Sequence, residues 1–234
     1  MMFDFQRMRQ INDAIRTGYL TVVDKEAALA QAKKVLELTL AEYSKVRADY
    51  WAQTYDVVYE YLTSSSAVTS YKSRMKRAMV EALIKAGDIA WEDGGNKLPL
   101  DEDASAWLTS RLNAELGFID NTFESLRLLR KEETEDTIKE AAIHQAFQRA
   151  DGYANTLDGI YSTVKAMSAK NMMLNFVGED GDESCTDCHR YKNKRHKASW
   201  WVAHDAIPPN RNFECHGYRC QHVLVTDSGE LFTI

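Results

Sequence analysis

The sequence predicts a mainly α fold in which a long-helix body, residues 1–177, precedes a small Cys-rich, zinc-knuckle-like module, residues 178–234. Two observations support this division. Pro99 is the only proline before Pro208, and proline-poor sequence favours long uninterrupted helices. All four cysteines and five of the six histidines, in contrast, lie within the last 50 residues. We place the boundary at the acidic, glycine-containing turn of residues 178–181.

Four helices are expected in the body. Asp24 is a typical N-cap residue, and the segment after it is rich in the strong helix formers Ala, Leu, Lys and Glu. Three serines at positions 64–66 stop this first helix, Gly94 follows the second, and Pro99 precedes the third. The expected ranges are 25–61, 69–91 and 101–131, and the fourth helix is capped by Thr134.

The fourth helix has the clearest apolar pattern. Its apolar residues alternate in spacings of four and three, which places them on one face, and we expect this face to pack against other helices rather than bind a cofactor. These residues are Ile143, Phe147, Ala150, Ala154, Leu157, Tyr161 and Val164. The aromatic residues between positions 43 and 61 do not share a face. We therefore expect that helix to bury one side and to offer another to a second copy in a homo-oligomer.

Charge is divided unevenly along the chain. Residues 181–234 hold seven basic and seven acidic residues, so the formal net charge of −6 belongs entirely to the residues before them. This balance disfavours a protein whose whole surface grips nucleic acid, but it allows a local basic patch. No segment reaches the roughly 18 consecutive apolar residues of a membrane span, and the N-terminal residues are too polar for a signal peptide. We expect a soluble chain made in a cytoplasm, with no membrane contact.

The cysteines form two short-spaced pairs, Cys185-x2-Cys188 and Cys215-x4-Cys220, separated by 26 residues. Each pair can place two thiolates in one tight loop, and two such loops can complete a tetrahedral site that suits zinc. Two disulfides, or buried free thiols, are the alternatives, although disulfides are typical of exported proteins. Further candidate ligands beside the pairs are His189, His216 and His222.

Turn residues and a terminal hairpin complete the predicted module. Gly217 lies where a knuckle turn between two ligands needs a positive φ, and Asn193 also tolerates that conformation. Residues 222–226 and 230–234 are rich in strand-forming residues and flank the turn sequence of residues 227–229. This pattern predicts a terminal β-hairpin.

A basic run with interleaved aromatic residues lies between the cysteine pairs. Cations attract phosphates and aromatic rings stack on bases, so the run suits nucleic-acid binding. The alternative is a solvated basic loop that leads into a short Trp-containing helix covering the metal site. The candidate nucleic-acid-binding residues are Arg190, Lys192, Lys194, Arg195, Lys197, Trp200 and Trp201.

These motifs together resemble the C-terminal segment of tailed-phage head morphogenesis proteins, the minor capsid proteins of the phage Mu type. The resemblance covers residues 153–224, about one third of the chain, and includes the Cys-x2-Cys pair, the Ser-Trp-Trp turn, the Pro-Pro element and the second cysteine pair. His216 stands where a glycine is usual in that family, and Asn193 also replaces a glycine. His222 occupies the place of an additional cysteine, so a shifted ligand set of Cys185, Cys188, Cys220 and His222 is an alternative.

The resemblance implies a low-copy structural protein of the virion, in the capsid interior or at the portal vertex. Its implied partners are the portal and major capsid proteins and packaged DNA, in head assembly and genome packaging or injection. The enzyme alternative is a metal-dependent nuclease or cell-wall hydrolase that uses His204, Asp205 or Glu214 beside an ion. Because four cysteines close a zinc site to water, we expect no catalysis.

Overall fold

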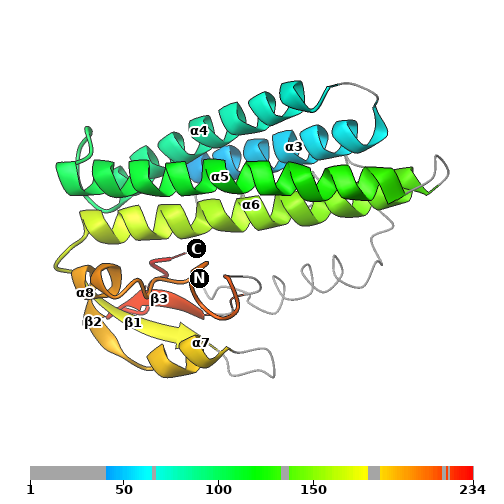
Figure 1. Ribbon diagram of the computed structural model, residues 1–234. Helices are drawn as coiled ribbons and strands as arrows, with labels where there is room; N and C mark the ends of the chain where they lie inside the picture. Colours follow the sequence, from blue (N-terminus) through cyan, green and yellow to red (C-terminus); the bar gives the residue numbers. More distant parts are fainter. Residues whose placement is uncertain are drawn as a thin grey trace.

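In the part of the chain that the structure describes, four long helices form the body of the molecule (Figure 1). The computed structural model describes residues 41–64, 67–132, 137–178, 185–217, 220 and 222–233. The helices are α3 (Ala41–Thr63), α4 (Val68–Asp93), α5 (Glu102–Glu132) and α6 (Ile138–Ser168). The predicted second and third helices are confirmed to within two residues at each end. Residues 25–40 of the first predicted helix, and the expected cap Thr134, lie outside the described residues.

Single residues account for the start of α5 and the end of α4. The Asp101 carboxylate accepts a hydrogen bond of 2.9 Å from the Ala104 N–H, which satisfies an amide group that the first turn of α5 leaves without a helical partner. The N–H of Gly94 donates to Ala90 O at 3.0 Å at the end of α4. A Cβ at Gly94 would lie 2.3 Å from the Cβ of Ser168, so only glycine lets this helix end approach α6.

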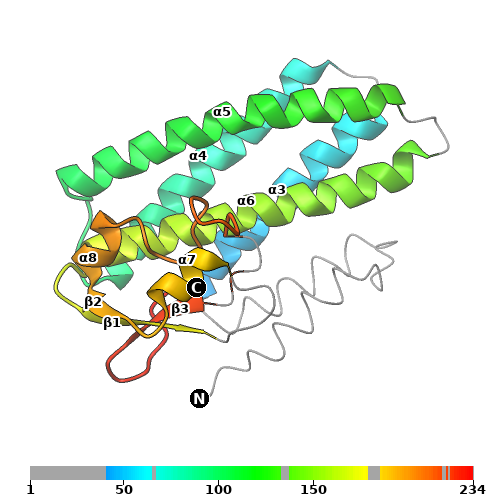
Figure 2. The ribbon, with the colours of Figure 1, turned by 60° about the horizontal axis from the view of Figure 1, so that its bottom comes forward.

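α6 is the central element of the bundle. It contacts α3, α4 and α5, and α4 also contacts α3 and α5. Figure 1 shows the four helices running side by side along the long dimension of the molecule, and the turned view of Figure 2 shows α5 and α6 with nearly parallel axes. Within the described ranges, every helix is too short or too polar to cross a lipid bilayer.

The predicted apolar face of α6 is in the core. Ala150, Ala154, Leu157, Tyr161 and Val164 are all fully buried. The two residues nearest the start of the helix, at positions 143 and 147, are only half-buried. The interpretation of this face as helix packing is therefore confirmed.

The aromatic residues of α3 are buried within this chain. Tyr43 packs on Tyr161 of α6 with ring centroids 4.3 Å apart, and Trp51 meets Phe147 of the same helix edge-on at 5.5 Å. Tyr61 contacts Phe123 of α5 at 5.1 Å. These three rings are thus covered by neighbouring helices of the same chain, whereas Tyr59 is only partly buried.

A buried ion pair joins α3 to α6. The Arg47 Nε donates to Asp158 at 2.7 Å, and the Tyr43 hydroxyl donates to the same carboxylate at 2.7 Å. Arg47 also donates to the Asn155 side chain at 3.2 Å. Burial, reinforced by the negative charge of Asp158, raises the pKa of Tyr43. Asp158 therefore satisfies two donors from α3 at a position where water has little access.

The C-terminal module contains a three-stranded antiparallel sheet and two short helices. The strands are β1 (Met173–Gly178), β2 (Arg195–Lys197) and β3 (His222–Thr226), in the order β2-β1-β3. α7 (Thr186–Tyr191) precedes β2, and α8 (Ala198–Ala203) follows it directly. β1 pairs with β3 from Leu174 opposite Thr226 to Gly178 opposite His222.

The sheet differs from the predicted hairpin. β3 forms where expected, but its partner after the turn is reduced to a single bridge between Val225 and Leu231. The main partner of β3 is β1, a strand that lies just before the predicted boundary and begins at Met173. The sheet of the module thus starts in residues that the sequence assigns to the body.

The module is docked on the second half of α6. Ala166 and Ala169, at the end of that helix, belong to the apolar core of the module. The Lys165 ammonium group lies 5.0 Å from the ring centroid of Phe232. Closer to the middle of α6, a Cβ on Gly159 would lie 2.7 Å from the backbone oxygen of Pro209. This close approach brings the loop after α8 directly onto the helix.

We expect Asp158→Asn to lower the free energy of unfolding by about 3 kcal/mol, because the change leaves the Arg47 guanidinium buried without its carboxylate. Urea denaturation measures this. Glu124→Gln is the control, since Glu124 pairs with Arg127 on an exposed surface and should change stability by less than about 1 kcal/mol. Equal effects of the two variants would contradict the structural role of Asp158.

We expect Gly159→Ala to destabilise the protein by about 1–3 kcal/mol, because the new methyl group meets a backbone oxygen that cannot rotate away. Gly117→Ala is the matched control, since Gly117 lies within α5 and its Cβ would meet no atom within 4 Å. The control should raise the melting temperature through helix propensity. A rise for both variants, measured by thermal unfolding, would show that the loop does not contact α6.

Candidate metal centre

The first cysteine pair is positioned by the start of α7. Cys185 is the N-cap residue of this helix, and Cys188 lies one turn later, so both sulfurs project from the same end of the helix. The His189 N–H donates to the backbone oxygen of Cys185 at 3.1 Å and closes the turn. Cys188 is buried in the module core, while Cys185 is partly exposed.

The second pair is brought to the first by a sharp reversal of the chain. After Cys215, both His216 and Gly217 have positive φ, of 52° and 71°. Two successive left-handed residues turn the backbone so that Cys220 returns beside β3. The expectation of positive φ at Gly217 is confirmed, as is that for Asn193, whose φ is 60°.

The two pairs converge on Cys188. Its sulfur forms one group with the thiols of Cys185 and Cys215, and a second with Cys220 and the imidazole of His222. Within each group the possible ligand atoms lie within 4.8 Å of one another. The Sγ atoms of Cys188 and Cys220 are 4.0 Å apart, close to the ~3.8 Å edge of a tetrahedron with four metal–sulfur bonds of about 2.3 Å.

These donors are suited to a metal ion. All four cysteines are free thiols, and the 4.0 Å between the Cys188 and Cys220 sulfurs is about twice a disulfide bond length of roughly 2 Å. His222 is 2% exposed, and its ring lies 5.4 Å from that of Phe176. Five protein donors are thus available for the four positions of a tetrahedral site, either as four cysteines or as three with His222.

The protonation of the thiols depends on their mutual contacts. Hydrogen bonds with Cys215 and Cys220, together with burial, raise the pKa of the Cys188 thiol. Hydrogen bonds from Cys188 and Cys220 lower the pKa of Cys215. Neighbouring thiols therefore stabilise one thiolate among them, whereas full ionisation of the cluster would require a cation to offset the repulsion between negative charges.

A reciprocal pair of hydrogen bonds holds the two cysteine loops together. The backbone N–H of Glu214 donates to the Asp187 carboxylate at 2.9 Å, and the N–H of Thr186 donates to the Glu214 carboxylate at 3.0 Å. The Thr186 N–H lowers the pKa of Glu214. We call these two contacts the loop clasp. Beneath it, the rings of Tyr191 and Phe213 stack at 5.7 Å.

The loop clasp was not foreseen from the sequence. Each of its carboxylates lies next to a cysteine in the chain, at positions 187 and 214, but spacing alone does not show which amide each one accepts from. Glu214 was a candidate for catalysis, and in the structure it braces the loop instead. His189, His204, Asp205 and His216 belong to neither ligand group that the described residues form.

The candidate nucleic-acid-binding residues divide into exposed cations and covered rings. Trp201 is 0% exposed and donates through Nε1 to the backbone oxygen of Leu174, so its ring is inaccessible to a base. The ring of Trp200 lies between His196, at 3.7 Å, and His204, at 3.8 Å. Both tryptophans therefore make packing contacts within the module.

The basic residues of the run remain mostly at the surface. Arg195 and Lys197 lie in β2 rather than in a loop. Arg195 forms an ion pair of 2.6 Å with Asp227, and together with Asn175 it holds the pKa of that carboxyl at about 2. The other exposed basic side chains of the run are Arg190, Lys194 and Lys197. Lys192 is partly exposed and makes contacts of its own.

No protein-family model, no curated protein and no solved structure matches the chain. The donor atoms themselves indicate the chemistry of the cysteine site: clustered thiols with one imidazole, in a partly buried position beside a small apolar core.

We expect Asp187→Ala and Glu214→Ala to weaken metal affinity about tenfold while leaving the stoichiometry unchanged, because they loosen the loop clasp but keep every ligand. Competition with a chromophoric chelator, with Zn²⁺ as the probe, measures this. Glu230→Ala is the control, since Glu230 is an exposed acid of the same module outside the clasp. Wild-type affinity in both clasp variants would show that the clasp does not preorganise the site.

Proposed function

We propose that this chain is a non-enzymatic structural protein in which a zinc ion holds a C-terminal module on a helical bundle. The observation that carries the proposal is the convergence of both cysteine pairs on Cys188, at the edge of the module core. Clustered thiols favour zinc over the harder ions that prefer oxygen ligands. Four or five protein donors also leave no open position for a reacting water molecule.

A bound zinc ion would stabilise the folded state of a module of this size. The apolar core of the module is small and borrows residues Ala166 and Ala169 from α6. Binding of structural zinc can contribute on the order of 10 kcal/mol to the folding of small domains. The helical body, by contrast, has a separate and larger core that contains none of the cysteines.

We further propose that the protein acts as a minor head protein of a tailed phage, near the portal vertex of the virion. The support is the resemblance of residues 153–224 to the C-terminal segment of that family, together with the long helical body to which this segment is attached. In this role the bundle would contact portal and major capsid proteins during head assembly and genome packaging or injection.

A second candidate function is nucleic-acid binding by the module. The observation that favours it is the exposure of Arg190, Lys194 and Lys197 around β2. Without accessible tryptophan rings, such binding would rely on phosphate contacts and would weaken steeply with salt. Packaged DNA is the polyanion nearest to a protein of the capsid interior, so the two functions are compatible.

We expect the purified chain to contain about one zinc ion and four thiols that titrate under denaturing conditions. Mass spectrometry for metals and a thiol assay measure the two quantities. Removal of the ion with a chelator should expose residues 185–217 to protease while far-UV circular dichroism still shows the helices of the body, because its core excludes the cysteines. Absence of both metal and free thiols would contradict the zinc site and show that the cysteines form disulfides.

The virion role is tested by assembling phage particles without this chain. We expect such particles to show defective head morphology, reduced DNA content or lost infectivity, with restoration by the wild-type protein supplied in trans. Particles that are normal in all three respects would exclude the proposed role in head assembly. The zinc measurement is independent of that outcome.

A further inference from the structure

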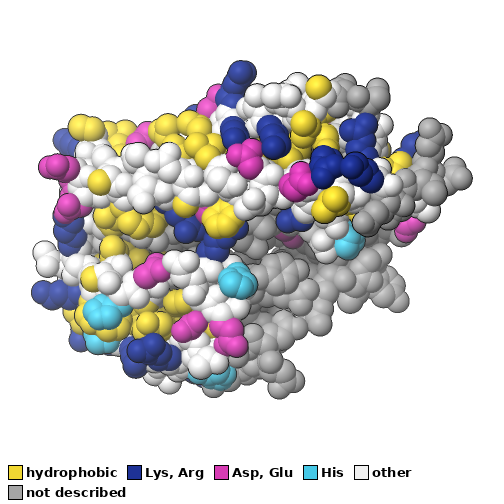
Figure 3. Space-filling model, in the orientation of Figure 1, with side chains coloured by type: hydrophobic (Ala, Val, Ile, Leu, Met, Phe, Trp, Pro, Cys, Tyr) yellow, Lys and Arg dark blue, Asp and Glu magenta, His cyan; other side chains and the backbone are white. Residues whose placement is uncertain are grey.

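A cavity lies between the helical body and the module. It has a volume of about 240 Å³, is open to solvent on one side, and is lined by α5, α6 and the loop of residues 205–217 that follows α8. Figure 3 shows Lys or Arg side chains in the hollow between α5 and the module. No part of this cavity overlaps the cysteine cluster, although His216 and Gly217, directly after Cys215, form part of its wall.

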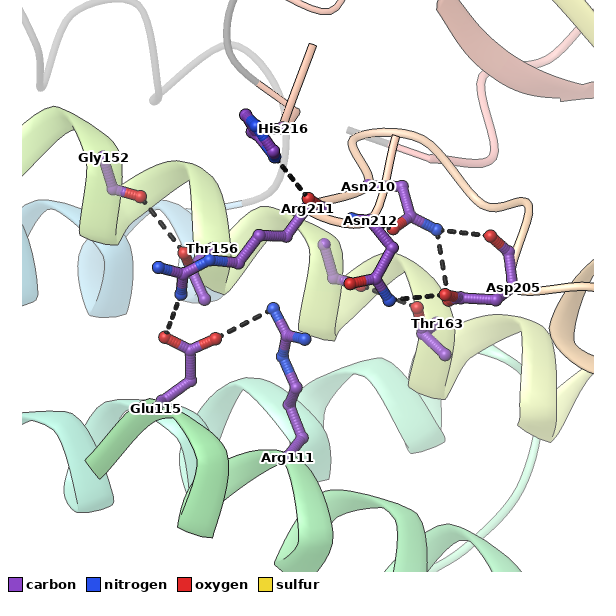
Figure 4. A network of polar contacts seen from close by, with 11 residues as sticks. Arg111, Glu115, Gly152, Thr156, Thr163, Asp205, Asn210, Arg211, Asn212 and His216 are labelled. Atoms are coloured by element: carbon purple, nitrogen blue, oxygen red, sulfur yellow. Dashed lines mark hydrogen bonds and ion pairs between the residues drawn. The ribbon is translucent and has the colours of Figure 1, made fainter. Parts of the chain in front are cut away.

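Three arginines line the cavity from three different segments: Arg111 from α5, Arg149 from α6 and Arg211 from the loop. Glu115, 0% exposed, fixes two of them, because its carboxylate oxygens contact Arg111 at 2.8 Å and Arg211 at 2.6 Å (Figure 4). The Arg211 guanidinium also lies 3.8 Å from the ring centroid of Phe118. Two guanidinium groups are thus held close together at one end of the cavity.

The positive charge of the lining is only partly neutralised. Glu115 offsets one of the three arginines, and the Asp205 carboxylate, which accepts hydrogen bonds from Asn210 and Asn212 on its own loop, offsets a second, so that one positive charge remains (Figure 4). Arg149 donates to the hydroxyl of Ser125 at 3.1 Å and has no carboxylate partner among the ion pairs of the described residues. Since each guanidinium has five N–H donors, these contacts leave donors available to an anion.

Gly152 leaves the space at the edge of the cavity. It lines the cavity within α6, and a Cβ there would meet no atom within 4 Å. Glycine in a helix interior is less stable than alanine by about 1 kcal/mol, and here packing does not require it. A side chain at this position would therefore occupy space at the cavity wall.

We propose that this cavity binds the terminal phosphate group of a small phosphorylated ligand. Guanidinium groups match phosphate oxygens with paired, charge-assisted hydrogen bonds, and three arginines suit the three terminal oxygens better than the two of a carboxylate. The volume accommodates one or two phosphate groups rather than a nucleic-acid strand. Trp107 and Tyr153 in the lining supply apolar surface for the rest of the ligand. This inference goes beyond the proposed function and does not depend on it.

Isothermal titration calorimetry of the full chain with inorganic diphosphate tests the proposal, with inorganic phosphate, acetate and a short DNA duplex as comparisons. We expect saturable binding of diphosphate, weaker binding of phosphate and none of acetate. Arg149→Gln should weaken diphosphate binding at least about tenfold while sparing the ion pairs of Glu115. Arg127→Gln is the matched control, since Arg127 pairs with Glu124 on the exposed face of α5.

A second pair of variants separates ligand binding from folding. Gly152→Leu should fill the cavity and abolish diphosphate binding with no loss of thermal stability, whereas Gly117→Leu places the same side chain elsewhere and should bind normally. The proposal is overturned by absence of saturable diphosphate binding, by equal weakening in both arginine variants, or by binding that survives Gly152→Leu. Preference for the DNA duplex over diphosphate, lost in Arg149→Gln, would assign the site to nucleic acid instead.

Discussion

The structure of the C-terminal module depends on the convergence of its thiols on Cys188. Thiolates at this spacing repel one another unless a cation lies between them. Among the described residues, the loop clasp and the stacked rings of Tyr191 and Phe213 also join the two cysteine loops. Everything between the two loops, including β2, α8 and the Pro208-Pro209 segment, is constrained by where they meet. The convergence of the two cysteine loops thus constrains the path of residues 189–214 between them.

α6 connects the two parts of the molecule physically. Its first three turns and its middle pack in the bundle, and its last turn contributes Ala166 and Ala169 to the core of the module. Gly159 lets the loop after α8 touch the helix backbone. Displacement of the module would therefore disturb a helix that also contacts α3, α4 and α5. The body and the module thus have separate apolar cores that meet along α6.

Carboxylates connect segments that are distant in sequence. Asp158 accepts hydrogen bonds from α3, Glu115 from the loop at Arg211, and Asp187 from the second cysteine loop. Buried or partly buried carboxylates require such partners because an unpaired charge out of water is strongly unfavourable. The same requirement makes these contacts specific. At the cavity between body and module, the arginines outnumber the carboxylates, and this excess of positive charge is the basis of the proposed phosphate site.

The sequence by itself determined the long helices and the convergence of cysteines, because helix propensity, end signals and ligand spacing are local properties. Only the tertiary structure decided the sheet, in which β1 and β3 pair although they are far apart in the chain. It also buried Trp201 beneath the basic run and brought Arg211 to Glu115, which lies 96 residues away. Neither strand pairing nor a salt bridge between distant segments leaves a periodic pattern in sequence, since each depends on how the helices have already packed.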